Sequence, residues 1–89
     1  MTMLATIDKT GAAAAEASAS ADVLFDLGLM SAAGRAGGID LIAAHKWFNL
    51  AAMRGHREAV AQRRDIATLM SDVEIALAQR EARAWLTAH

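Results

Sequence analysis

The chain of 89 residues contains no cysteine, no proline and no tyrosine, and it has only two tryptophans and two phenylalanines. Without cysteine, neither a disulfide framework nor a thiolate metal site is available, so an apolar core has to hold the fold together. Proline is absent, β-branched and aromatic residues are few, and alanine supplies about a quarter of the residues, which favours helix over strand. We therefore expect an all-α protein with one small domain.

Long apolar runs are also missing. No uninterrupted run approaches the ~18 to 20 apolar residues that a membrane-spanning helix needs. Ala17-Ser18-Ala19 resembles a signal-peptidase site, but the alanines before it, interrupted by Glu16, are too weakly apolar for the core of a signal peptide. We expect no membrane span and a cytoplasmic location.

The net charge of −1 is unevenly distributed. Residues 1 to 44 are acidic, whereas the rest of the chain carries more bases than acids and includes a cluster formed by Arg54, Arg57, Arg63 and Arg64. An anionic partner is one interpretation of this cluster. Because there is neither an excess of positive charge nor an aromatic stacking platform, we expect a solvated helix face and no nucleic-acid binding.

The most clearly marked helix lies between Asp40 and Gly55. Asp40 is suited to the N-cap position, and Gly55 to the left-handed conformation that ends a helix. Spacings of three and four place one set of residues on a single side, namely Ala44, Trp47, Phe48, Ala51 and Ala52. A polar set falls on another side, namely His45, Lys46 and Asn49. The pattern predicts a core helix with a solvated back.

A helix is also predicted over Ala21 to Ala33. It begins either in the alanine-rich run from Ala12 or at a cap supplied by Ser18 or Ser20, and residues 1–11 before it are expected to form a flexible arm. Its inner face is expected to consist of Leu24, Leu27, Gly28 and Ser31. The opposite face is expected to consist of Asp22, Asp26 and Leu29.

Two glycine features shape this part of the chain. Gly28 lies inside the predicted helix, where glycine costs about 1 kcal/mol relative to alanine, so we expect a ring from Trp47 or Phe48 to approach it closely. Three glycines between Gly34 and Gly38 break the helix. No strand precedes them and no Gly-Lys-Ser/Thr follows, so they are not read as a phosphate-binding loop. A connection this short predicts antiparallel neighbouring helices.

Two further helices are predicted after Gly55. The third runs from about His56 to Met70, with inward residues Ala59, Ile66, Leu69 and Met70. Ser71 and Glu74 then match the capping-box pattern and start a fourth helix that runs to about Leu86. Its apolar stripe is expected to consist of Ile75, Ala78, Ala82, Trp85 and Leu86. Residues 87 to 89 are expected to fray.

An internal repeat connects these helices. A shift of 38 residues superposes Ala21 on Ala59, Ala44 on Ala82 and Trp47 on Trp85. Periods of about 34 to 40 residues are typical of helical solenoids, in which stacked helix pairs cover one another. We therefore expect antiparallel hairpins stacked as a short α-solenoid of about four helices. Residues 12–55 would form the first pair and residues 56–89 a degenerate, capping pair.

The residues of this pattern resemble the Sel-one-like repeat (SLR) family, a relative of the tetratricopeptide repeat. In that family a Leu-Gly pair lies on the first helix, glycines lie in the turn, and Ala-x-x-Trp followed by Ala-Ala-x-x-Gly lies on the second. The matching positions here are Leu27, Gly28, Gly34, Asp40, Ala44, Trp47, Ala51, Ala52, Gly55 and Ala59, and Trp85 lies in a segment similar to the closing helix of SLR proteins. Ser31, Ala36 and Gly37 depart from the family, which usually has tyrosine at the first position and glycine and valine at the other two.

No catalytic constellation is visible. The three histidines, His45, His56 and His89, are dispersed, whereas metal ligands have to converge at about 2 Å. Asp22 and Asp26 share a helix face but lack a predicted pocket, so a solvated acidic face is expected. Met30 and Met70 are expected in the core, and Met53 at the surface. We expect no enzyme, no catalytic residue, no metal site and no cofactor.

The resemblance implies a non-catalytic adaptor or scaffold that binds another protein. Binding would use a groove along the first helix of each pair, with candidate residues Asp22, Asp26, Leu29 and Arg63. The alternative is a small accessory subunit docked permanently in a larger complex, because so short a solenoid leaves apolar ends to cover. A third hypothesis is that the protein binds anionic partners electrostatically through the arginine cluster.

Overall fold

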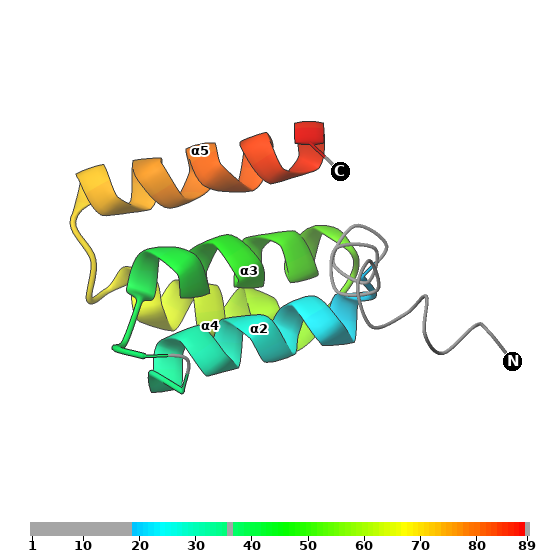
Figure 1. Ribbon diagram of the computed structural model, residues 1–89, viewed down its shortest axis with the longest axis horizontal. Coiled ribbons are helices and arrows are strands. Elements are labelled where there is room, and N and C mark those ends of the chain that lie inside the picture. The colour runs from blue at the N-terminus through cyan, green and yellow to red at the C-terminus, as the bar shows by residue number, and fades with distance from the viewer. Residues whose placement is uncertain (1–18, 36, 89) are drawn as a thin grey trace, which may run out of the picture.

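The computed structural model describes residues 19–35 and 37–88, and these residues form four α-helices and no strand. The helices are α2 (Ala21–Ala33), α3 (Leu41–Met53), α4 (Arg57–Ala67) and α5 (Asp72–Ala88). The predicted all-α fold class is thus confirmed. In Figure 1, α2 and α4 run in one direction along the molecule and α3 and α5 in the other. The flexible arm and the early helix start predicted within residues 1–18 lie outside the described residues.

Local capping groups set the ends of α2 and α3. The Ser20 hydroxyl accepts from the Val23 N–H at 3.2 Å, and the Asp40 carboxylate accepts from the Ala43 N–H at 2.9 Å. Each bond satisfies a backbone donor that has no partner within the helix. Gly34, with φ +74°, follows α2, and Gly55, with φ +95°, follows α3. Asp40, Gly34 and Gly55 were predicted in these roles, and the structure confirms them. Ser20 was one of the alternative starts predicted for the first helix, and it is the cap that the structure shows.

The predicted capping box at the start of α5 is present with both of its bonds. The Ser71 N–H donates to Glu74 Oε1 at 2.8 Å, and the Glu74 N–H donates to the Ser71 hydroxyl at 3.1 Å. The helix continues to Ala88, so the fraying predicted for residues 87 and 88 is wrong. At that end the Thr87 hydroxyl donates to the Arg83 carbonyl at 3.0 Å. His89 lies outside the described residues.

The α4 helix is shorter than the sequence predicts. It ends at Ala67 because the next three N–H groups each bond a carbonyl three residues back, which tightens the chain into turns. The Thr68 hydroxyl also donates to the Asp65 carbonyl at 2.6 Å. Leu69 therefore lies in a turn, where it is exposed, while Met70 packs against the core as expected.

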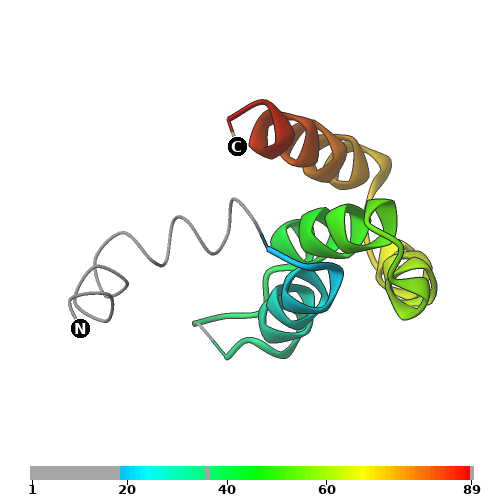
Figure 2. The same ribbon diagram turned by 90° about the vertical axis from the view of Figure 1, so that its right-hand side faces the viewer.

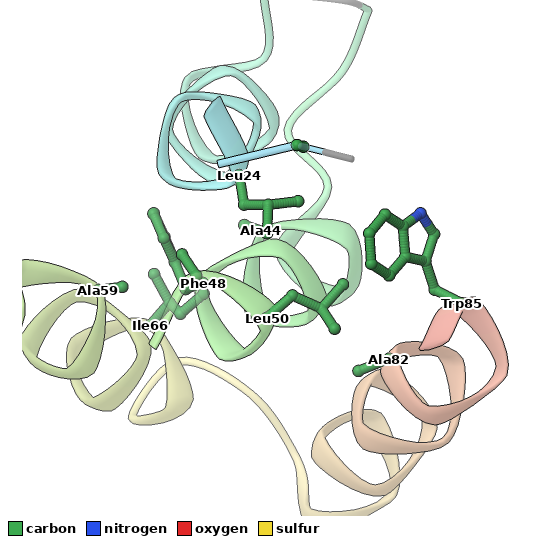
Figure 3. Close-up of a cluster of buried hydrophobic side chains, with 10 residues drawn as sticks. Leu24, Ala44, Phe48, Leu50, Ala59, Ile66, Ala82 and Trp85 are labelled. Atoms are coloured by element: carbon green, nitrogen blue, oxygen red, sulfur yellow. The ribbon is translucent and has the colours of Figure 1, made fainter. Parts of the chain in front are cut away.

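The α3 helix lies at the centre of the fold. It packs against α2, α4 and α5, whereas those three helices meet one another at few points (Figures 1 and 2). Figure 3 shows Leu24 above Ala44, Phe48 beside Ile66 and Ala59, and Leu50 directed toward Ala82 and Trp85. The short connection between α2 and α3 makes them antiparallel neighbours, as predicted. The helices of residues 56–89 both pack on α3 and do not form a close hairpin with each other.

The solvated back predicted for α3 is wrong. His45 is only 3% exposed, and both Lys46 and Asn49 are half-buried. Every residue from 41 to 52 is buried or half-buried, because neighbouring helices cover α3 on three sides. Asn49 accepts a hydrogen bond from Arg63 of α4, so this side of α3 faces α4.

Three predicted inward residues lie at the surface instead. Met30, Leu69 and Leu86 are 38%, 71% and 40% exposed. Met30 lies on the outer flank of α2, Leu69 lies beyond the end of α4, and Leu86 follows the buried Trp85 at the edge of the α5 stripe. Met53 is exposed as predicted. Among the described helices, none combines the length and apolar character needed to cross a membrane.

Candidate interaction surface

The side of α2 that faces away from α3 exposes a continuous set of residues. Leu24 and Gly28 are buried on the inner side, so the helical period carries the intervening residues outward. We call this surface the α2 outer face and define it as Asp22, Val23, Asp26, Leu29, Met30 and Ala33, all of which are exposed. It combines two carboxylates with three large aliphatic side chains. Asp22, Asp26 and Leu29 were predicted to share this face, and the structure places them there.

A hollow occupies the second half of this face. It is lined by Asp26, Leu29, Met30, Ala33 and Arg35. Its lining combines apolar side chains with one carboxylate and one guanidinium, and Ala33 contributes only a small side chain. The backbone around it is held in place, since the Arg35 N–H donates to the Met30 carbonyl at 3.1 Å and the Asp40 N–H donates to the Ser31 carbonyl at 3.0 Å. The sequence did not predict that Arg35 and Met30 would contribute to this surface.

Asp22 is held by a contact that sequence reasoning missed. Its Oδ1 lies 3.5 Å from His56 Nε2, while His56 Nδ1 accepts from the Ala59 N–H at 3.2 Å and caps α4. Because Nδ1 accepts, a neutral His56 carries its proton on Nε2, which faces the Asp22 carboxylate. The His56 ring also stacks on Phe25, with centroids 4.0 Å apart and an angle of 14° between the planes. The Asp22 side chain is still 90% exposed, so it remains accessible to a partner.

Arg63 does not belong to this surface. The prediction that it is an exposed binding candidate is wrong, because its side chain is half-buried and donates to Asn49 Oδ1 at 2.6 Å. This bond links α4 to α3, so Arg63 contributes to the packing between those helices. No sequence signal pairs Arg63 with Asn49, because the contact depends on how the two helices cross.

The arginine cluster is likewise divided among different roles. Arg54 donates to the Ala19 carbonyl and lies over the Trp85 ring, with its guanidinium carbon 5.4 Å from the ring centroid. Together with Arg63, this places two of the four arginines in contacts within the fold, although Arg54 is exposed, as Arg57 and Arg64 are. A surface for an anionic partner therefore has three exposed arginines and lacks the half-buried Arg63.

His45 is the most deeply buried titratable side chain among the described residues. Burial lowers its pKa from the usual 6.5, and the positive charge of Arg63 lowers the pKa further, while a backbone hydrogen bond opposes these effects. The neutral ring is thus favoured, with Nδ1 lacking a hydrogen-bond partner in the described part of the chain. Within that same part, no three His, Asp or Glu side chains converge as a possible metal site.

Comparison of the chain with protein-family models, with curated proteins and with solved structures gave no match. The geometry of the α2 outer face therefore carries the functional proposal.

Proposed function

We propose that the chain is a non-catalytic module that binds another protein through the α2 outer face. The observation that carries the proposal is the hollow itself, whose lining combines the exposed side chains of Leu29 and Met30 with the carboxylate of Asp26 and the guanidinium of Arg35. Protein interfaces typically combine apolar with polar side chains, and the lining of the hollow contains both. Exposed apolar residues that adjoin one another on a helix are a common mark of such a site.

The rigidity of α2 supports this role. Its inner side packs on α3, Ser20 caps its first turn, and Gly34 ends it with N–H contacts to the Met30 and Ser31 carbonyls. Binding to a preformed helix face loses little conformational entropy on the module's side, so more of the contact energy becomes affinity. The α2 outer face lies on a single helix, so binding there does not require a second helix with a similar exposed face.

We also propose that the module is of the SLR type. The spacing of the Leu27-Gly28 pair, the Ala44-x-x-Trp47 pattern and Gly55 supports this assignment, and so does the alternating direction of the four described helices. In this interpretation α2 and α3 form one packed pair, and α4 and α5, which meet each other at few points and both pack on α3, form a degenerate second pair. Proteins built from such pairs use exposed helix faces for binding other proteins.

A random peptide library selected against the purified chain tests the proposed function. The matched variants are Ala33→Arg, which fills the hollow, and Ala76→Arg, which adds the same side chain to an exposed alanine of α5. We expect selected peptides to bind the wild type and Ala76→Arg equally, and to lose at least tenfold in affinity for Ala33→Arg, which corresponds to about 1.4 kcal/mol. Peptides that bind all three proteins alike would contradict a binding role for the α2 outer face.

A permanently docked subunit is the second candidate, and a specific observation favours it. Ile39, Leu69 and Val73 are aliphatic side chains that are largely exposed and lie outside the α2 outer face. A permanent neighbour that covered them would remove this apolar area from water. Light scattering after gel filtration separates the two candidates. A stable monomer over a hundredfold range of concentration supports a transient module, whereas concentration-dependent self-association supports a docked subunit.

A further inference from the structure

We infer that the partner segment is an amphipathic helix that lies antiparallel to α2, with basic residues in its C-terminal half, large apolar residues at its centre and an acidic residue near its N-terminus. This inference rests on the proposed function and specifies the chemistry of the partner at the same surface. It follows from the order in which charged and apolar groups occur along the α2 outer face.

The charges on this surface change sign along the helix axis. Asp22 and Asp26 occupy the first half of α2, whereas Arg35 follows its C-terminal end. At a rise of about 1.5 Å per residue, roughly 10 Å separate Asp26 from Ala33, where α2 ends, and Gly34 then turns the chain before Arg35. A complementary segment therefore needs its bases and its acid about two helical turns apart. A uniformly basic or uniformly acidic segment would place like charges together at one end.

The helix dipole decides the direction of the partner. An antiparallel helix places its C-terminal half over Asp22 and Asp26, where bases on the partner pair with the two carboxylates. Bases near a C-terminus and acids near an N-terminus also stabilise the partner helix itself. A parallel helix would need the reverse charge order, which weakens an isolated helix by the same effect. The antiparallel arrangement is thus the one in which binding and helix formation favour the same sequence.

The centre of the surface is suited to an apolar side chain. Leu29 and Met30 form the apolar part of the hollow and Ala33 leaves space beside them, so a leucine or phenylalanine of the partner can enter. Methionine is unbranched and adapts to different shapes, so Met30 allows more than one side chain there. The exposed part of the face from Asp22 to Ala33 corresponds to about 17 Å of helix, which a partner of three to four turns covers.

Two synthetic peptides of identical composition test the inference. Both are sixteen residues long and blocked at both ends, with no staple, so that the helix dipole acts on each peptide as it would on the partner segment. Each carries a nitroxide spin label at its last residue, which broadens the amides nearest to it. Each has the same central leucines. One carries glutamates in its first turn and lysines in its last two turns, and the other carries the same residues in the reverse order. Each peptide is titrated into the full chain labelled with ¹⁵N, and amide shifts report affinity and location.

We expect the peptide with C-terminal lysines to bind at least tenfold more tightly, with shifts confined to the α2 outer face and Arg35 and with its label broadening the amides near Asp22 and not those near Arg35. In the double variant Asp26→Lys with Arg35→Glu the label should move to the Arg35 end, because a parallel peptide then pairs the charges. The control variant Arg80→Glu with Glu81→Lys exchanges charges at exposed positions of α5 and should leave the preference unchanged.

The other outcomes overturn the inference in distinguishable ways. Equal binding of both peptides at α2 would remove the directional claim and leave the interaction module in place. Tighter binding of the reverse peptide would establish a parallel partner. Absence of shifts at α2 with either peptide, while library peptides still depend on Ala33, would show that the partner has different chemistry. Failure of the library selection as well would overturn the proposed function itself.

Discussion

The ring of Phe48 lies against the backbone of Gly28, so closely that a Cβ added to this glycine would stand 2.5 Å from two ring carbons. This contact lets α2 approach α3, and it confirms the prediction that a large ring covers Gly28. Phe48 is fully buried and also contacts Phe25, with ring centroids 5.5 Å apart. The ring therefore has little freedom to move aside. The glycine in mid-helix is explained by this close packing.

Replacing Gly28 with alanine should destabilise the fold, although alanine is the better helix former by about 1 kcal/mol. The new methyl group would overlap the Phe48 ring, and overpacking of this kind typically costs about 1 to 3 kcal/mol. We expect Gly28→Ala to lower the free energy of unfolding in a urea titration. Gly38→Ala is the matched control, because Gly38 has no atoms within 4 Å of an added Cβ and no positive φ, and it should remain within about 0.5 kcal/mol of the wild type. An unchanged or raised stability of Gly28→Ala would contradict the packing argument.

The two tryptophans should differ in their contribution to stability. Their rings meet edge to face with centroids 6.0 Å apart, but Trp85 is buried at 6% exposure, whereas Trp47 is half-buried. We expect Trp85→Ala to cost about 3 to 5 kcal/mol, which is a large part of the stability of so small a domain, and Trp47→Ala to cost less. If the alanine variants fail to fold, Trp85→Phe and Trp47→Phe keep much of the side-chain volume. They test in the same way whether Trp85 contributes more to stability than Trp47. A double-mutant cycle should give a coupling of about 0.5 to 1.5 kcal/mol. Equal losses would show that the difference in burial has no energetic consequence.

Features that depend on neighbouring residues in the chain could be predicted from the sequence. Ser20, Asp40 and the Ser71/Glu74 box each bond an N–H three residues away, so their roles follow from local spacing alone. Most residues on the inner and outer faces of α2 were predictable for the same reason, because one neighbour, α3, covers this helix. Met30 is the exception, since it was expected in the core and is exposed. The burial of His45 could not be predicted, because the number of helices packed around α3 is a property of the whole fold.

The candidate surface also has some features that local spacing predicts and others that depend on the whole fold. The exposure of Asp22, Asp26 and Leu29 follows from the helical period, whereas the contribution of Arg35 depends on the path of the backbone after Gly34. Arg63 was misplaced because its partner, Asn49, lies on another helix. The His56 cap gave only a weak signal, since histidine is not among the strongly preferred capping residues.

Burial of His45 should make stability depend on pH. The folded state lowers its pKa from the usual 6.5, so the unfolded chain binds a proton more readily than the folded chain does. The contribution of His45 is therefore fully present above about pH 6.5 and is lost as the pH falls through the folded pKa. We expect the free energy of unfolding to fall on acidification from about pH 8 to about pH 5, and to fall less in His45→Leu. The difference between the two proteins cancels the groups that both retain, and a flat difference would contradict a shifted His45.

Removing Arg63 should have two effects, one on stability and one on His45. Arg63→Ala deletes the hydrogen bond to Asn49 Oδ1 and leaves that oxygen half-buried without this donor, which should cost about 1 to 2 kcal/mol after allowance for partial exposure. The neighbouring Arg64 is exposed, so Arg64→Ala serves as the matched control and should change stability by less than about 0.5 kcal/mol.

The loss of Arg63 should also raise the pKa of His45, because the charge of Arg63 is the second cause of the lowered pKa of this histidine. Burial is the larger cause, so the pKa of His45 should stay below the usual value. An NMR titration of the His45 ring in both variants measures the shift directly. A His45 pKa that moves equally in the two variants would show that Arg63 acts on the histidine only through the fold.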